Sequence, residues 1–167
     1  MHKKLRSAGI IVLLLFTLSL QAQKFESAID YNDYLSSTTD TLYKLGEKWG
    51  SRFSEVKEKR EFEKLVPVRK EIQAFIERKK MEFLLLKDFK NSERLRLAMI
   101  EFLVFQGYMI EQGFMPFESI SKTAADTVID DYVKKLTTLS EGEGTMLQKV
   151  IKEQEAYAAK NGFRIGD

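Results

Sequence analysis

Few residue types in this chain can carry out catalysis or hold a metal ion. The sequence has no cysteine, and its single histidine is His2. Catalytic triads need histidine, zinc sites are built mainly from cysteine and histidine, and di-iron bundles carry Glu-x-x-His on two helices. The chain beyond His2 therefore cannot build these sites, and we expect neither a metal nor another cofactor.

One serine–lysine pair has the spacing of a known acyl-enzyme motif. Ser54 and Lys57 match S-x-x-K, which some serine acyl-enzymes use together with S-D-N and K-T-G. Both companion motifs are missing, and so are the phosphate-binding G-x-x-x-x-G-K-[ST] and G-x-G-x-x-G sequences. The sequence thus favours a protein that is not an enzyme. Catalysis by carboxylate, lysine or tyrosine alone remains as an alternative.

The first candidate group for ligand or partner contact is Tyr31, Asn32 and Asp33. Tyr31 falls on the apolar stripe of a predicted helix, and Asn32 and Asp33 lie beside that stripe. A polar ligand contact is one interpretation of this group. The other is a buried tyrosine whose hydroxyl bonds to a neighbour.

The second candidate group is Glu101, Phe102 and Phe105, in the most apolar predicted helix. Half of the 12 phenylalanines lie within the 35 residues from 83 to 117. Such a concentration predicts either a phenylalanine-rich core or a cavity or groove for an apolar ligand or a partner helix. In an apolar helix the Glu101 carboxylate must be paired or must extend to solvent.

The start of the chain has the layout of a secretory signal peptide. Basic residues precede the uncharged stretch 8–20, and Ala22 is a small residue at a plausible cleavage point. The stretch of 13 residues is shorter than the ~20 that a spanning helix needs. We therefore expect a signal peptide over residues 1–22, one mature domain over residues 23–167, and export to the periplasm or the cell surface. An uncleaved anchor is the alternative.

The predicted mature chain is close to neutral. The whole chain has 27 basic and 25 acidic residues, and the signal peptide holds three of the basic ones, so 24 minus 25 leaves a charge of −1. Signs alternate along residues 52–78, which is typical of a solvated helix face rather than of a nucleic-acid site. We expect no nucleic-acid partner. Without cysteine the chain has neither disulfides nor a lipoprotein anchor.

Apolar residues at helical spacing predict an all-α fold. The clearest stripe repeats every seven residues: Ala28, Leu35, Leu42, Trp49 and Val56. Gly46 and Gly50 on the same helix weaken it locally or permit a close helix crossing. We expect an up-and-down helical bundle of four main helices plus a short fifth, with no transmembrane segment in the mature chain.

Sequence signals set the expected helix ends. The predicted helices span residues 25–59, 67–90, 93–113, 122–139 and 140–161. Pro116 predicts a break over residues 114–117. Ser140 and Glu143 have the spacing of a capping box, although the fourth and fifth helices could also be continuous. Asn161-Gly162 is a normal C-terminal stop.

Three short sequences connect the chain with a known family. They are Leu20-Gln21-Ala22-Gln23, Ala28-Ile29-Asp30-Tyr31-Asn32-Asp33 and Tyr157-Ala158-Ala159-Lys160-Asn161-Gly162-Phe163-Arg164-Ile165. Through them the chain resembles small exported helical surface proteins of unknown function from Bacteroidota-like and leptospiral bacteria. Gly162 departs from the N-F-R tail of such relatives. The resemblance implies an envelope location and a helical bundle, and it brings no catalytic residues.

Together these features predict an exported interaction or binding module that is not an enzyme. Its partner would be an unknown protein or an apolar ligand. The alternative is a carrier that holds an apolar small molecule or lipid in a phenylalanine-lined cavity of the bundle.

Overall fold

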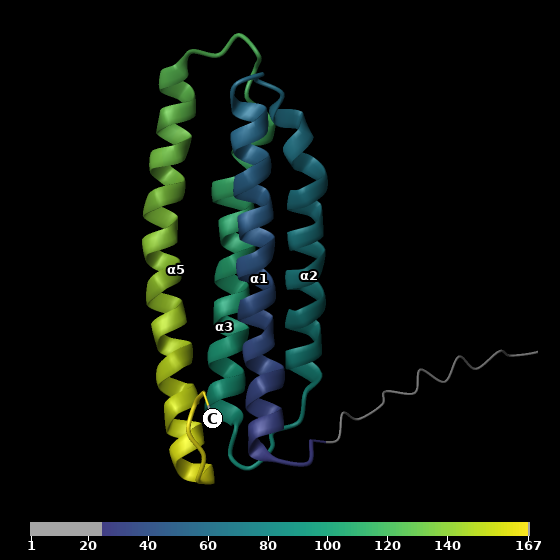
Figure 1. The fold of residues 1–167 in the computed structure, drawn as a ribbon, viewed down its shortest axis with the longest axis vertical. Helices are drawn as coiled ribbons and strands as arrows, with labels where there is room; N and C mark the ends of the chain where they lie inside the picture. Colours follow the sequence, from purple (N-terminus) through teal and green to yellow (C-terminus); the bar gives the residue numbers. More distant parts are fainter. Residues whose placement is uncertain (1–24, 167) are drawn as a thin grey trace, which may run out of the picture.

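Four long helices run side by side, alternately up and down, in the computed structural model, which describes residues 25–166 (Figure 1). They are α1 (Ala28–Lys57), α2 (Val66–Leu85), α3 (Glu93–Met109) and α5 (Asp126–Asn161). No strand occurs in the described part of the chain. The predicted all-α bundle is therefore confirmed, while the predicted signal peptide lies outside the described residues.

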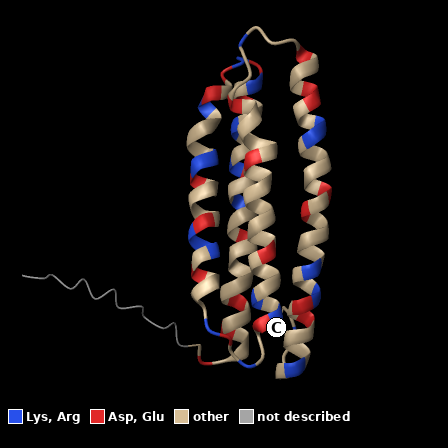
Figure 2. Ribbon diagram, turned by 180° about the vertical axis from the view of Figure 1, so that it is seen from behind, with Lys and Arg blue, Asp and Glu red and all other residues tan. Residues whose placement is uncertain are grey.

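Shorter elements connect the long helices. The 3-10 helix η1 (Phe62–Leu65) leads into α2, and the π-helix η2 (Ile110–Phe114) joins α3 to the short α4 (Met115–Glu118). Charges of both signs alternate along α2, as the sequence predicts for a solvated face (Figure 2). Within residues 25–166, no helix combines the length and the apolar composition that crossing a bilayer requires.

The start of α1 is fixed by a capping box that the sequence encodes locally. The Asp30 backbone N–H donates to Ser27 Oγ at 3.1 Å, and the Ser27 backbone N–H donates to Asp30 Oδ2 at 2.9 Å. These two bonds satisfy donors that a helix N-terminus otherwise leaves free. From this start, the predicted stripe from Ala28 to Val56 is buried at all five of its positions.

The second helix ends five residues earlier than the predicted Lys90. Leu86 is extended, with ψ of 129°, and Lys90 and Asn91 have positive φ values of 49° and 64°. The Phe89 backbone N–H donates to Ser92 Oγ at 2.9 Å and closes this loop. A helix cannot pass through such backbone angles, so residues 86–92 form a turn before α3.

The predicted break at residues 114–117 is wrong. The backbone continues through the π-turn into α4, and Pro116 lies in the first turn of that helix. Proline is tolerated there because its missing N–H would have no partner in a first turn. The third helical run therefore extends to Glu118.

The last helix is continuous, which was the alternative left open by the sequence. It begins at Asp126 rather than near residue 122 and passes through Ser140 without interruption. Ser140 Oγ donates to the Thr137 carbonyl at 2.9 Å and caps nothing. Gly162, with φ of 73°, ends the helix as predicted, because glycine adopts the left-handed region without strain.

Two glycines bring α5 close to α3 and η2. A Cβ at Gly142 would lie 2.8 Å from the ring of Phe105, and a Cβ at Gly113 would lie 2.9 Å from a Leu136 methyl group. By contrast, a Cβ at Gly46 or Gly50 of α1 would meet no atom within 4 Å. A methyl group at Gly113 or Gly142 would therefore require the facing side chain to move, whereas space is left beside α1.

We expect opposite effects from alanine at these two kinds of site. Gly46→Ala should raise the free energy of unfolding by up to about 1 kcal/mol, because alanine is the better helix former and meets open space. Gly113→Ala should be less stable than Gly46→Ala by at least about 1 kcal/mol, because its methyl group overlaps Leu136. Urea unfolding followed by circular dichroism measures both. Equal stability of the two variants would contradict the packing described.

A largely buried ion pair joins α2 to α4. Arg69 Nε and Nη2 donate to the two carboxylate oxygens of Glu118 at 2.8 and 2.9 Å, and Nη1 donates to Gln73 Oε1 at 2.8 Å. The Arg69 and Glu118 side chains are only 9% and 11% exposed. The bond with Glu118 raises the pKa of Arg69. This two-pronged geometry fixes α4 against the start of α2.

Removing one partner of this pair should be costly. Arg69→Met leaves the Glu118 carboxylate largely buried without its partner, and we expect a loss of about 3 kcal/mol in the free energy of unfolding. The double variant Arg69→Met/Glu118→Leu should recover most of that loss, because it buries no unpaired charge. Chemical denaturation of the three proteins decides this, and a double variant no better than Arg69→Met would refute it.

Candidate binding groove between the first and last helices

The first and last helices are joined at their ends and separated in between. At one end Gln154 Nε2 donates to Asn32 Oδ1 at 3.3 Å, and the rings of Tyr31 and Tyr157 lie 6.0 Å apart. At the other end Arg60 donates to the Ala124 carbonyl and pairs with Asp126. No other hydrogen bond, ion pair or ring contact links α1 to α5 among residues 25–166.

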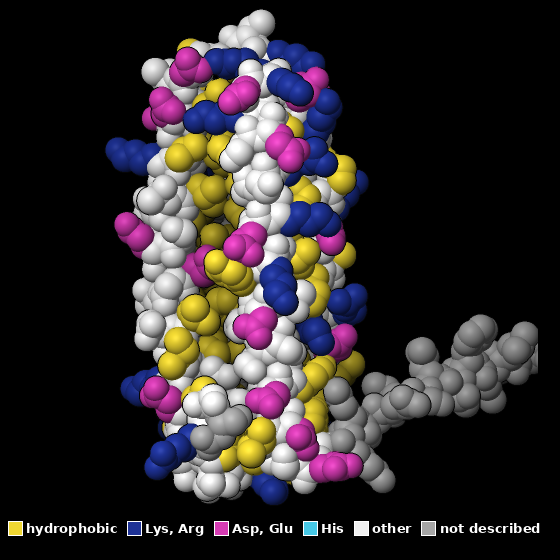
Figure 3. Space-filling model, in the orientation of Figure 1, with side chains coloured by type: hydrophobic (Ala, Val, Ile, Leu, Met, Phe, Trp, Pro, Cys, Tyr) yellow, Lys and Arg dark blue, Asp and Glu magenta, His cyan; other side chains and the backbone are white. Residues whose placement is uncertain are grey.

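The surface between these two ends is hollowed and apolar. Figure 3 shows hydrophobic side chains in a long depression between α5 and α1, with charged side chains along its edges. The depression forms because α5 packs mainly against α3 and makes few contacts with α1. We call it the α1–α5 groove.

Small residues form the α1 side of the groove. Asn32 faces α5, so residues four, seven, 11, 14 and 18 positions later share its helix face. They are Ser36, Thr39, Tyr43, Gly46 and Gly50. Four of them are small. The fifth, Tyr43, is 69% exposed and belongs to the rim.

Larger apolar residues form the α5 side. Gln154 faces α1, and the residues on its helix face toward the N-terminus include Ile151, Leu147 and Leu136. All three are half-buried, so each still presents apolar surface to solvent. A groove with one small-residue wall and one apolar wall can take up an apolar chain or helix.

The Tyr31 group divides between the core and the surface. Tyr31 is fully buried, and its hydroxyl makes no hydrogen bond of good geometry within the described residues. Burial raises the pKa of that phenol, and a contact with the Ser92 side chain partly offsets the rise. Asn32 is buried against Gln154 and donates to Asp33 Oδ1 at 3.3 Å, while Asp33 itself is exposed. Asn32, through its bond with Gln154, and Tyr31, through its ring contact with Tyr157, both lie at this end of the groove.

The Glu101 group lies elsewhere. Glu101 pairs with Lys149, which is five positions and so about 140° around α5 from Gln154. Phe102 is buried in the core, and Phe105 packs its ring against Gly142. The structure therefore does not bring the two predicted groups together.

The α5 wall of the groove was missed because its residues belong to ordinary apolar stripes. The glycines gave a usable signal, since Gly46 and Gly50 are four positions apart and so share one face. The sequence did not show that this face looks onto open space.

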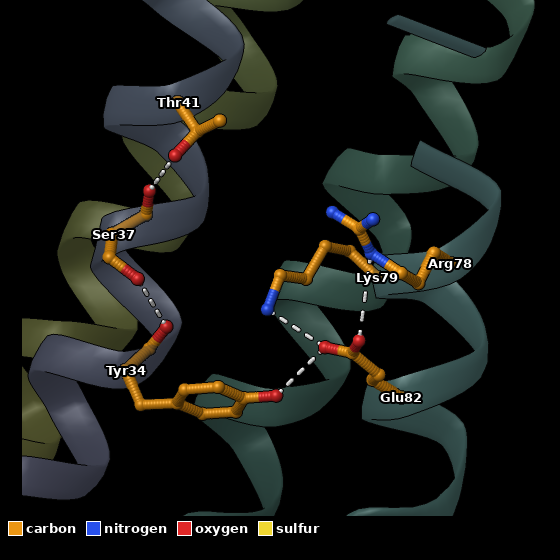
Figure 4. Close-up of polar contacts among 6 residues, drawn as sticks. All are labelled: Tyr34, Ser37, Thr41, Arg78, Lys79 and Glu82. Carbon is orange, nitrogen blue, oxygen red and sulfur yellow. Dashed lines mark hydrogen bonds and ion pairs between the residues drawn. The ribbon is translucent and has the colours of Figure 1, made fainter. Parts of the chain in front are cut away.

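A separate polar cluster joins α1 to α2 (Figure 4). The Tyr34 hydroxyl donates to Glu82 Oε2 at 2.9 Å, and Lys79 Nζ donates to the same oxygen at 2.8 Å. Lys79 also lies 4.7 Å from the centre of the Tyr34 ring, a cation–π contact. Arg78 approaches Glu82 at 3.8 Å.

The protonation states of Tyr34 and Glu82 are those expected of a contact that stabilises the fold. Burial, and then the hydrogen bond to Glu82, raise the pKa of Tyr34. Burial opposes the charged form of Glu82, but the hydrogen bonds from Lys79 and Tyr34 outweigh it, so the pKa of Glu82 is lowered. A tyrosine that keeps its proton so firmly is a poor general base near neutral pH. The cluster stabilises the α1–α2 contact.

This lowered pKa predicts how stability depends on pH. A carboxylate with a lowered pKa in the folded state stabilises the protein above its unfolded-state pKa, and this contribution is lost as the pH falls through the folded-state value. We therefore expect Glu82→Gln to be less stable than the parent at pH 7 and to approach it in stability near pH 3. Because the Glu82 side chain is 38% exposed, the difference at pH 7 should be below about 1 kcal/mol.

Urea unfolding at pH 7, 5 and 3 measures this difference. Glu55→Gln is a matched control, because its partner Arg52 lies on the same helix and no contact to α2 is lost. A gap between the parent and Glu82→Gln that stays constant over this pH range would contradict the assigned ionisation.

An open cleft of about 420 Å³ lies between α1 and the start of α2. Its lining residues are Lys48, Ser51, Arg52, Glu55, Lys64, Pro67, Val68 and Glu71. The three cations already pair with Glu71, Glu55 and Glu61, respectively. The cleft therefore has little spare charge with which to bind an ion. No group of three or more carboxylates able to hold a metal occurs among the residues described.

Ser54 of the S-x-x-K sequence is exposed, and its hydroxyl donates to the Gly50 carbonyl at 3.1 Å within its own helix.

Comparison of the chain with protein-family models, with curated protein sequences and with solved structures gave no match.

Proposed function

We propose that this protein is an exported binding module, not an enzyme, which receives an apolar helical segment of a partner protein in the α1–α5 groove. The observation that supports it is the apolar depression between two helices that make few contacts with each other (Figure 3). Placement in the cell envelope follows from the signal-like start of the chain.

A helix suits the shape and lining of the groove. Amphipathic helices commonly dock with their apolar face in a hydrophobic groove. Gly46 and Gly50 would let the backbone of such a helix approach closely, while Leu147 and Ile151 would contact its apolar side chains. Tyr43 at the rim is of a type that often anchors protein interfaces.

A carrier of an apolar small molecule is the second candidate. The apolar floor of the groove favours it, as does the phenylalanine content of the core. Small-molecule sites, however, usually bury 70–90% or more of their ligand. A depression open along its length suits an elongated partner better.

Filling the groove should abolish binding without damaging the fold. Gly46→Leu/Gly50→Leu places two side chains where a Cβ meets no atom, and leucine is a better helix former than glycine. We expect this variant to be at least as stable as the parent. A photoreactive phenylalanine analogue at position 43 should crosslink a partner in cells of the source organism, and the filled groove should reduce that product at least tenfold.

Gly107→Leu is the matched control, since it is the same substitution on another helix, also with no atom within 4 Å of the added Cβ. It should leave the crosslink unchanged. An equal amount of crosslinked product from Gly46→Leu/Gly50→Leu would refute the proposal. If a lipid copurifies with the parent but not with Gly46→Leu/Gly50→Leu, and no protein is crosslinked, the carrier function replaces this proposal.

A further inference from the structure

A second apolar surface lies at the end of α2, away from the α1–α5 groove. Met81, Leu84 and Leu85 are 53%, 52% and 64% exposed. Their spacings of three and four residues make them neighbours on the helix surface. We call these three side chains the α2-end patch. Large apolar side chains exposed together in this way usually mark a contact with a partner or a membrane.

Lysines without ion-pair partners surround the α2-end patch. Lys80 stands four positions before Leu84 on the same face of α2, and Lys87 follows two residues after the end of that helix. Neither lysine pairs with a carboxylate in the described structure. Lys90 follows in the loop, over the ring of Phe89. Residues 77–97 hold seven basic and four acidic residues, a net charge of +3, against the predicted −1 of the mature chain.

The nearest carboxylates are largely neutralised by other residues. Glu82 bonds with Lys79 and Tyr34, and Asp88 accepts from Arg96 at 2.7 Å. Glu77 and Glu93 remain as exposed acids at the edges of the region. The centre of the patch is therefore both apolar and positively charged.

From this combination we propose that the α2-end patch attaches the protein to an anionic phospholipid bilayer. The three apolar side chains enter the interfacial layer, and Lys80, Lys87 and Lys90 contact lipid phosphates. Buried apolar area and attraction to anionic lipid are the two contributions by which amphipathic helices bind membrane surfaces. The attachment is peripheral and is separate from the α1–α5 groove.

A second copy of the chain fits this surface less well. In a two-fold symmetric dimer, each patch would face its own copy. The unpaired lysines beside Leu84 would then oppose one another, and like charges brought together across an interface are unfavourable. An anionic bilayer complements the same charges.

Vesicle cosedimentation tests the proposal. The protein used is the chain from residue 23, which contains every element of the described bundle. Vesicles of phosphatidylcholine with 40% phosphatidylglycerol should bind it in 20 mM salt, and pure phosphatidylcholine should bind it at least tenfold more weakly. Lys80→Gln/Lys87→Gln should weaken binding about thirtyfold. Leu84→Ser/Leu85→Ser should weaken it about tenfold or more, because the apolar contribution is lost.

Matched controls separate the patch from general charge and hydrophobicity. Lys134→Gln/Lys152→Gln removes two exposed lysines from α5, and Val104→Ser/Tyr108→Ser removes two exposed apolar side chains from α3. Both should bind as the parent does, and circular dichroism should show that every variant keeps its helix content. The groove-filling variant should also bind normally, so that failure of one proposal leaves the other standing.

Three results would overturn the attachment. The first is equal binding to neutral and anionic vesicles. The second is equal weakening by the control pairs. The third is a parent protein that sediments as a dimer, binds no vesicles and becomes a monomer in the Leu84→Ser/Leu85→Ser variant, which would make the patch an interface between copies.

Discussion

The close packing of the last helix against the third is the constraint on which the rest of this structure depends. Gly142 gives room to the Phe105 ring, and Gly113 gives room to Leu136. These contacts hold α5 on α3 and leave it separated from α1 over most of its length. A bundle is usually closed on all sides by interlocking side chains at near-crystal density. Here one side is incomplete, and the α1–α5 groove results.

Polar contacts fix the arrangement at points where apolar packing alone would allow sliding. The Asn32–Gln154 bond joins the start of α1 to the end of α5, and the Tyr34–Glu82 bond joins α1 to α2. The Arg69–Glu118 pair holds α4 against α2. Apolar contacts are non-directional, whereas a buried donor must meet its acceptor in one geometry. These directional contacts therefore restrict how the helices can slide past one another.

The two proposed surfaces differ in chemistry as well as in place. The α1–α5 groove is a concave apolar depression with a glycine-containing wall, which suits a segment that inserts. The α2-end patch is exposed and apolar, with unpaired lysines nearby, which suits a charged and extended surface. A protein with both could hold a partner while attached to a bilayer.

By itself, the sequence determined the helices and the buried stripe of the first one. The seven-residue spacing from Ala28 to Val56 and the stop at Gly162 act over one or two helical turns, so local physics is enough to predict them. The capping box at Ser27 is equally local, although the predicted helix begins at residue 25. Likewise, the absence of cysteine and histidine beyond His2 excluded whole classes of chemistry.

Only the tertiary structure decided how the helices continue and which of their faces stay open. Pro116 is accommodated by a π-turn, and Ser140 lies inside a continuous helix beside the glycine that receives Phe105, so packing overrode both local signals. Gly46 and Gly142 look alike in the sequence, yet one faces open space and the other a ring. The difference is set by the neighbouring helix, because contacts between residues far apart in the chain arise only when the bundle assembles.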